Sequence, residues 1–496
     1  MTSERSTIQY PLSRAHARKP GGCAENPPKL LRRERGVEAR GETPTLQFIF
    51  EIIKPDNDSG YALYLVLIVL TVAAILFTIT LTSIRNTNLQ SIRSLQRTQA
   101  DLLAQSGIAR LEYFLNGGDG HDITWQSARY EERIGSYGAI LLSCARWGAY
   151  NRFSSIGTRL KVSRTMAGLV GRDIPGVLRP ALTLSGHIGG LVLAEGSAID
   201  GQVVLHHGAV KRNNNRTVER GSGKWTVHRS SASLPFDKRP LDDFIVKCRT
   251  LLANASGDTL AVPSSITLTR DNDSLIGRSP LVVLGSCTVG RIDGAGATVV
   301  VDGTVLVNNS TACMGICFVA QRVIVEGGQT RGCVFFCDKP IVIAAGTHAS
   351  QFFSTDSITV AEDARCASPA VLACRRVVRP DSSLSGCIII AGDCRVSAHA
   401  ICYADSTELF RGMRAGPGIV VNQGAEINGF LITDSDIDIQ AATVNGGMYA
   451  RSISTMHNNL PSKNWLYACA LREPGGTMMF PLLGEIPMRV EMNRER

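Results

Sequence analysis

The feature that most restricts how this chain can fold is an apolar run near its N-terminus. No charged residue occurs from Ser59 to Ile84, in the sequence SGYALYLVLIVLTVAAILFTITLTSI. As a helix this run would be about 39 Å long, which exceeds the roughly 30 Å hydrocarbon core of a bilayer. A secretory signal would be shorter and would be followed by a small-residue cleavage site. The sequence therefore predicts a single transmembrane helix over residues 59–84.

The segment after this run continues the helix with an amphipathic pattern. Residues 85–116 contain no proline, and Asn116-Gly117-Gly118 provides a stop signal. We expect one helix of about 55 residues that packs against other helices. Its apolar positions recur near helical spacing and are Ile84, Ile92, Leu95, Leu102, Leu103, Ile108, Leu111 and Leu115.

Residues 1–58 are predicted to be a disordered basic leader, because they are rich in arginine, proline and glycine and lack sustained periodicity. Residues 1–40 carry nine Lys and Arg against four Glu, and so supply much of the net charge of +9. Elsewhere no long basic run with interleaved aromatic residues occurs, so nucleic acid is not an expected partner. A basic segment ahead of a membrane span is typical of the cytoplasmic side, where anionic lipids attract it.

Beyond about residue 180, short apolar β triplets followed by Gly, Asp or Asn recur. Several begin 17 or 18 residues apart, at 281 and 299, at 323, 341 and 358, and at 419 and 437. A short fixed period is typical of a solenoid, in which each coil buries its inner face by stacking on the next. The predicted fold class is therefore mainly β: a single-pass transmembrane helix with an amphipathic extension, a short hairpin, and a parallel β-helix.

The predicted domain limits follow from these patterns. Residues 117–179 form a short hairpin and linker, with turns at Gly148 and Gly157, and residues 180–460 form the β-solenoid. A polar stretch, followed by the pattern of a short helix around Leu241–Leu252, predicts an insertion on the solenoid at about 208–278. Residues 461–496 form a C-terminal tail.

Most of the fourteen cysteines lie between Cys287 and Cys402, in the β-rich region, where two i, i+4 pairs occur. Cys313 and Cys317 form CMGIC, and Cys333 and Cys337 form CVFFC. Positions i and i+4 of a strand share a face, so stacked coils could bring the four thiols together. The favoured hypothesis is an interior ladder of buried cysteines; disulfides, or a zinc or iron–sulfur site, are the alternatives. No cofactor and no metal are expected.

Other polar clusters give little support for catalysis. The acidic run at 434–438 alternates with apolar residues, which predicts that Asp436 and Asp438 lie on the solvent side of a strand. Calcium binding and paired-carboxylate glycoside chemistry are alternatives. His206 and His207 are adjacent and would point to opposite faces of a strand. Because no common nucleophile, phosphate-loop or zinc-protease motif occurs, the chain is not expected to be an enzyme.

The segment beginning at Ser59-Gly60-Tyr61-Ala62-Leu63 resembles the N-termini of type IV pilin-like proteins, above all the PilX-type minor pilins and GspK-type pseudopilins. Arg85, the small-residue stretch at 103–110 and the segment WGAYNRFSSIGT are also similar to that family. The resemblance implies that a prepilin peptidase cleaves between Gly60 and Tyr61. Leu65 occupies the fifth mature position, where major pilins have glutamate, which favours a minor, tip or priming role.

The C-terminal half is similar in rhythm to bactofilin-type solenoids, a likeness of architecture that implies no site. The leading hypothesis is a structural, non-enzymatic component of a pilus-like or secretion pseudopilus-like assembly, whose solenoid is a spacer, tip or adhesive surface. Alternatives are a membrane-tethered β-helical carbohydrate-active enzyme and a bactofilin-like scaffold. Expected partners are the lipid bilayer and other pilin-like helices or solenoid ends, and no small-molecule ligand is named. The expected location is the inner membrane, with a cytoplasmic N-terminus and an exported C-terminal domain, although Arg85, Arg93 and Arg97 alone favour the opposite orientation.

Overall fold

The structure is a computed structural model. It describes residues 58–115, 128–186, 189–206, 208–212, 225–229, 237–255, 262, 265–276, 280–294, 296–377, 384–404, 416–457, 460–475, 478–481 and 488–493. The predicted leader, apart from Asp58, lies outside the described residues. The chain divides into two compact units, Met1–Asn86 and Thr87–Arg496, and each is described by itself.

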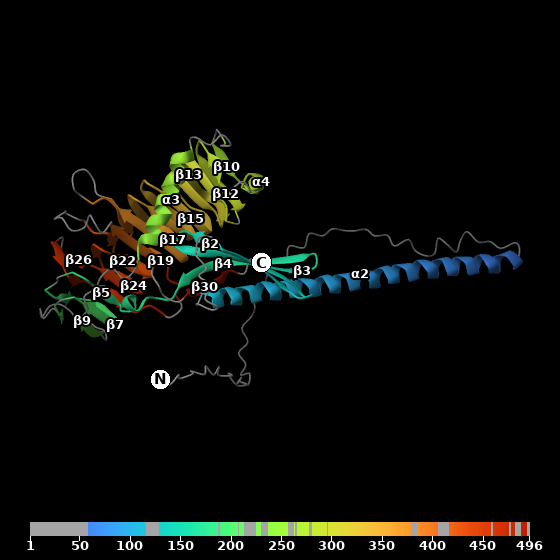
Figure 1. Cartoon of the computed structure of the whole chain (residues 1–496), viewed down its shortest axis with the longest axis horizontal. Coiled ribbons are helices and arrows are strands. Elements are labelled where there is room, and N and C mark those ends of the chain that lie inside the picture. The colour runs from blue at the N-terminus through green and yellow to red at the C-terminus, as the bar shows by residue number, and fades with distance from the viewer. Residues whose placement is uncertain are drawn as a thin grey trace. The chain divides into compact units, whose positions relative to one another are not determined.

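One long helix, α2 (Asp58–Leu115), contains both the predicted span and its predicted amphipathic extension. Its first part, through residue 86, is the described portion of the first unit. It is the one helix, among the residues the structure describes, that is long and apolar enough to cross a membrane. The expectation of a single apolar N-terminal helix followed by a mostly β domain is confirmed (Figure 1).

In the second unit, the strands that follow α2 form an antiparallel sheet in the order β1-β2-β3-β4-β30. The sequence predicts only a short hairpin here, and the sheet is larger because β4 extends the meander and the C-terminal β30 pairs with β4. These strands are β1 (Ala128–Ile134), β2 (Gly138–Trp147), β3 (Tyr150–Arg159), β4 (Val162–Arg172) and β30 (Met488–Asn493).

The remaining strands build a parallel β-solenoid with three faces, and the long strand β13 passes through all of them. Val299 of β13 lies on face A and pairs with β11 and β14; Val305 lies on face B and pairs with β12 and β14; Cys313 lies on face C and pairs with β12 and β15. The strands of the first coils are β10 (Ile266–Leu268), β11 (Leu281–Val283), β12 (Cys287–Asp293), β13 (Thr298–Met314), β14 (Cys317–Val325), β15 (Gln329–Cys337), β16 (Ile341–Ser354) and β17 (Ser357–Arg376).

The later coils use shorter strands because turns interrupt each face more often. They are β18 (Cys387–Ile390), β19 (Arg395–Ala404), β20 (Ile419–Val421), β21 (Glu426–Asn428), β22 (Leu431–Thr433), β23 (Asp436–Ile439), β24 (Thr443–Asn445), β25 (Met448–Ala450), β26 (Ser452–His457), β27 (Leu460–Lys463), β28 (Trp465–Leu466) and β29 (Ala470–Arg472). β26 and β27 pair as an antiparallel hairpin, whereas the other pairings of these coils are parallel.

Residues that are 17 or 18 positions apart in the sequence pair on neighbouring coils, as the predicted period requires. Leu281 pairs with Val299, Ile341 with Ile358, and Ile419 with Ile437. The inward residues of successive coils form one continuous apolar core along the solenoid. Stacking places like side chains over one another, so that the rings of Phe318, Phe335 and Phe352 are parallel at centroid separations of 5.2 and 5.1 Å.

The first solenoid strands along the chain lie at the opposite end of the solenoid from β10. β5 pairs with β25, β6 with β28, and β7 with β29, so residues 182–205 stack on the coil built from residues 448–472. This group comprises β5 (Leu182–Leu184), β6 (Leu191–Leu193), β7 (Ala198–Leu205), β8 (Val210–Arg212) and β9 (Trp225–Arg229), preceded by the short helix η2 (Gly176–Leu178).

Helix α3 (Arg239–Ala255) returns the chain across face A to the first coils, where η3 (Arg270–Asn272) and α4 (Asp273–Ile276) follow β10 (Figure 1). Its 17 residues span about 25 Å, which matches about five coils at 4.8 Å each. The segment predicted as an insertion at about 208–278 therefore includes the connection between the two ends of the solenoid. Leu241, Phe244, Ile245 and Cys248 bury the apolar side of α3.

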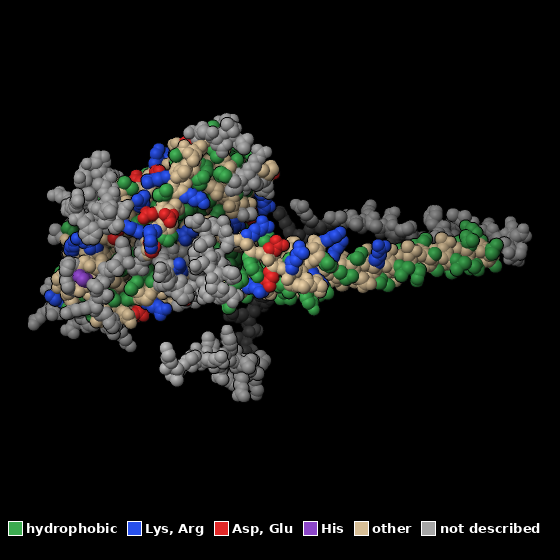
Figure 2. Space-filling view, viewed as in Figure 1, with side chains coloured by type: hydrophobic (Ala, Val, Ile, Leu, Met, Phe, Trp, Pro, Cys, Tyr) green, Lys and Arg blue, Asp and Glu red, His purple; other side chains and the backbone are tan. Residues whose placement is uncertain are grey.

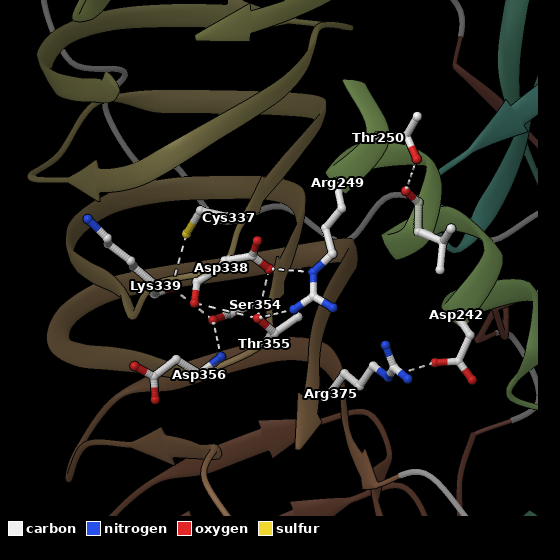
Figure 3. Close-up of polar contacts among 11 residues, drawn as sticks. Asp242, Arg249, Thr250, Cys337, Asp338, Lys339, Ser354, Thr355, Asp356 and Arg375 are labelled. Atoms are coloured by element: carbon white, nitrogen blue, oxygen red, sulfur yellow. Dashed lines mark hydrogen bonds and ion pairs between the residues drawn. The ribbon is translucent and has the colours of Figure 1, made fainter. Parts of the chain in front are cut away.

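Polar contacts at both halves of α3 fix its position on face A (Figure 3). Asp242 accepts a hydrogen bond from the Tyr403 hydroxyl at 3.1 Å and pairs with Arg375 at 3.1 Å. Further along the helix, Arg249 contacts Asp338 at 2.8 Å and the Thr355 hydroxyl at 3.2 Å. Because these pairs are partly exposed, they contribute orientation more than stability, and the apolar contacts supply most of the attachment.

Candidate functional site: the apolar helix and its docking sheet

The first part of α2 exposes large apolar side chains on every side. From Leu63 to Ile84, its exposed large hydrophobic residues have exposed fractions between 42% and 74%. Figure 2 shows hydrophobic side chains covering this part of the helix. Soluble proteins rarely leave a continuous apolar surface of this size in water. This surface therefore requires lipid, other apolar helices, or both.

The hydroxyl groups within the apolar run are satisfied by the helix itself. Thr71, Thr78, Thr80 and Thr82 each donate a hydrogen bond to the carbonyl oxygen four residues earlier, at 2.7–2.8 Å. An unpaired hydroxyl in hydrocarbon costs several kcal/mol, on the order of 4. Internal pairing removes that cost, so the threonines are compatible with a membrane-spanning segment.

The predicted processing position lies at the start of α2. The helix begins at Asp58, so Gly60 and Tyr61 occupy its first turn. Leu65, at the fifth position after Gly60, is exposed. Cleavage between Gly60 and Tyr61 stays a prediction.

The last four turns of α2, within the second unit, bind the antiparallel sheet through small residues. Ala100, Ala104 and Gly107 are buried, and a Cβ atom at Gly107 would lie 2.8 Å from side-chain carbons of both Ile140 and Leu142. Small side chains let the helix backbone approach the sheet closely. Next to them Ile108 and Leu111 bury apolar surface against the sheet. Ile84, Ile92, Leu95 and Leu102 of the predicted amphipathic face remain exposed.

The residues of β3 that contact this part of α2 are also small. Ser155 donates a hydrogen bond to the Ala104 carbonyl oxygen at 2.8 Å. A Cβ atom at Gly157 would lie 2.5 Å from the Ala104 amide nitrogen and 2.9 Å from Leu103 Cβ. The prediction of a turn at Gly157 is wrong: the residue lies inside β3, and it is small because the helix backbone occupies the space of a side chain.

Polar contacts surround this apolar interface. Arg159 donates to the Gln99 side-chain oxygen at 3.0 Å, Arg110 pairs with Glu132 at 2.6 Å, and Arg164 pairs with Asp101 at 3.5 Å. These exposed pairs contribute little stability each, about 0–1 kcal/mol. Their main effect is to fix the rotation of the helix on the sheet.

The β2–β3 turn attaches the sheet to face A of the solenoid. Gln351, which is 1% exposed, accepts a hydrogen bond from the Ala149 amide at 2.7 Å and donates to the Trp147 carbonyl oxygen at 3.1 Å. The Trp147 indole donates to the Gly332 carbonyl oxygen at 2.8 Å. Gly148 makes the turn at φ +62°, as the predicted turn there requires. No sequence pattern points to Gln351, because a single glutamine in a strand has no distinctive signal.

The four cysteines of the predicted cluster do not converge. Cys333 and Cys337 both point into the core, as i and i+4 on one strand should, and the Cys333 and Cys313 sulfur atoms are 3.6 Å apart. Cys317 instead faces outward on face A. The turn at Gly315 separates β13 from β14 and ends the strand alternation between Cys313 and Cys317, so a four-thiol site is incorrect. Among the described residues, no three His, Cys, Asp or Glu side chains gather as a metal site.

Burial makes Cys317 and Cys337 poor nucleophiles. It raises the pKa of Cys317 to about 12 and that of Cys337 to about 12. A thiol with such a pKa is almost wholly protonated at neutral pH and is unreactive. These residues therefore serve as small apolar groups of the core.

The acidic run follows the predicted alternation in β23. Ile437 and Ile439 are buried, while Asp436 and Asp438 point outward and are half-buried. Asp436 accepts a hydrogen bond from Ser452 at 2.6 Å, and burial raises the pKa of Asp438. His206 is half-buried, and His207 lies outside the described residues.

Comparison with known proteins gives little further information. No protein-family model matches the chain, and no curated protein matches it. The crystal structure of the competence-associated pilin ComZ from Thermus thermophilus is similar to it, with 10% sequence identity over 80% of this chain and 97% of that chain. The TM-score of that match is 0.18, too low to establish a common fold. The functional argument therefore rests on the residues described above.

Proposed function

We propose that this chain is a non-enzymatic structural subunit of a type IV pilus-like or secretion pseudopilus-like assembly. In this proposal α2 inserts into the cytoplasmic membrane and packs among other apolar helices, with the N-terminus in the cytoplasm. The solenoid is exported and acts as a spacer, tip or adhesive surface. The observation that carries the proposal is the division of α2 into an exposed apolar part and a part docked on a sheet by small residues.

That division supports assembly rather than simple anchoring. A helix that only anchors a domain needs about 20 apolar residues and no rigid continuation. Here the helix continues without interruption into the docked segment, whose Ala104 carbonyl is bound by Ser155. An exposed apolar residue beyond the span, such as Leu95, then suits contact with a neighbouring helix. Leu65 removes a charge from the helix and supports a minor or tip position over a repeating one.

The proposal is tested by N-terminal sequencing of the membrane-associated protein from the native host, with and without its prepilin peptidase. We expect a mature start at Tyr61 in the first strain and an intact leader in the second. Replacing Gly60→Val should block cleavage, whereas Gly176→Val, in a site where no atom lies within 4 Å of the added Cβ, should not. An intact leader in both strains would overturn the pilus-like function and leave α2 as an anchor.

A further inference from the structure

Face C of the solenoid carries a groove of about 590 Å³ beside its first coils. Two outward rows of side chains border it, because residues on stacked coils lie in register. The first row runs through Ala312 and Thr347, and the second row, two residues further along each strand, runs through Ala349. The side chains of these three residues are short. These small side chains lie between longer ones and form the floor of the groove.

The walls of the groove are cationic. Arg270, Arg291 and Arg331 come from three separate segments and line it together, against one carboxylate among the described lining residues, Asp293. The described lining thus carries three guanidinium groups and one carboxylate. Guanidinium groups bind carboxylates through two parallel hydrogen bonds, which favours an anionic ligand.

The cationic row continues beyond the groove along the solenoid axis. In register, the first outward row is formed by Arg291, Ala312, Gln329, Thr347, Arg365 and Arg395, and Arg395 pairs with Glu426 of the next coil at 3.5 Å. Five coil steps separate its two ends, a distance of about 24 Å at 4.8 Å per step. A small anion would occupy only part of this row. An extended anionic polymer could contact its whole length.

The side chains between the arginines favour a sugar polymer. Gln329 and Thr347 are exposed and can exchange hydrogen bonds with hydroxyl groups, and Met314 offers an apolar surface. None of the described lining residues is aromatic, whereas proteins that bind single-stranded nucleic acid stack its bases on aromatic rings. Glycoside cleavage would use a pair of carboxylates, and the described lining contains only Asp293, so the groove suits binding without cleavage.

We propose that the groove on face C binds a linear acidic polysaccharide, with uronate carboxylates on Arg291 and Arg331 and sugar hydroxyls on Gln329 and Thr347. This site does not depend on the proposed pilus-like function, since it belongs to the solenoid alone. Cleavage at Gly60 and binding at face C can therefore succeed or fail separately.

The test measures binding of oligogalacturonate to the full-length protein in detergent by isothermal titration calorimetry. The double variant R291Q/R331Q should raise Kd at least about tenfold, because two charge-assisted contacts are lost. The matched control R322Q/K211Q removes the same charge from exposed positions on face B and should leave Kd unchanged. Thr347→Trp fills the groove without changing its charge and should also weaken binding. Circular dichroism and thermal unfolding check that each variant is folded.

Several results would overturn the proposal. These are an absence of binding by the parent protein, equal weakening by the groove and control variants, and equal affinity for neutral dextran. Tighter binding of single-stranded DNA that R291Q/R331Q abolishes would reject the polysaccharide in favour of nucleic acid.

Discussion

The docking of α2 on the antiparallel sheet can be tested by adding one methyl group. In Gly157→Ala the new Cβ atom would lie closest to the Ala100 carbonyl oxygen and 2.5 Å from the Ala104 amide nitrogen, whereas ordinary contact begins at 3.4 Å. The obstructing atoms belong to the helix backbone, so no side chain can rotate away. The helix must therefore retreat by at least about 1 Å, the difference between 3.4 and 2.5 Å.

A retreat of this size has an estimable cost. The hydrogen bond from Ser155 to the Ala104 carbonyl, now 2.8 Å, would lengthen to roughly 3.8 Å and be lost. Losing it costs about 1 kcal/mol, and overpacking adds about 1–3 kcal/mol. We therefore expect helix docking to weaken by about 2–4 kcal/mol, which corresponds to about 30- to 1,000-fold in the opening equilibrium.

Hydrogen exchange of the full-length protein in detergent, followed by mass spectrometry, measures this opening. Peptides covering residues 99–115 should exchange faster by that factor, while peptides from β14 to β16 should keep their protection. Gly176→Ala is the matched control, since its Cβ meets no atom within 4 Å. If Gly157→Ala leaves exchange of residues 99–115 at the parental rate, the close helix–sheet contact is wrong.

Three further predictions concern the solenoid. In a Cys23→Ser background, the half-buried Cys387 should react first with an aromatic disulfide reagent, and the buried thiols should react only after unfolding. Rapid reaction of several thiols in the native protein would contradict the buried core. Gln351→Leu should lower the free energy of unfolding by about 2–4 kcal/mol, because it leaves the Ala149 amide and the Trp147 carbonyl unpaired. Urea titration measures this change, and an unchanged free energy of unfolding would contradict the role given to the two hydrogen bonds of Gln351. Burial lowers the pKa of His399 from 6.5 to about 4, so the unfolded chain binds the proton more readily and stability should fall by up to about 3 kcal/mol as pH drops from 6.5 to 4. His399→Gln should reduce that slope in urea titrations, and an unchanged slope would assign it to other groups.

The sequence predicted those parts of the fold whose causes are local. An uncharged run of this length determines a helix, and β triplets at a period of 17 or 18 residues determine which residues stack, as with Ile341 on Ile358. The local sequence does not determine at which end of the solenoid a coil stacks. Leu182 follows the same pattern as any other coil, and it pairs with Met448 because chain closure places it there.

In the candidate site, too, the sequence predicts only the features that have a local cause. Apolarity identified the exposed part of α2, whereas its docked part depends on which residues of a distant strand face it. The sequence alone therefore predicts a turn at Gly157, although this residue is small because it accommodates the helix backbone. Cys317 was placed with Cys313 because strand alternation was extended across Gly315, where the chain turns. Both errors arise where a tertiary contact or a corner interrupts a regular pattern.

The pairing of β30 with β4 gives the second unit a closed arrangement. The chain leaves the antiparallel sheet after β4, passes through all coils of the solenoid, and returns to the same sheet at β30. The helix segment that packs on this sheet and the C-terminal strand are thus attached to one element. A pulling force applied through the docked segment of α2 would reach the sheet first and would pass to the solenoid through the hydrogen bonds of Gln351 and through the chain on either side of the coils. In the assembly proposed above, the helix–sheet contact would therefore bear a load before the stacked coils do.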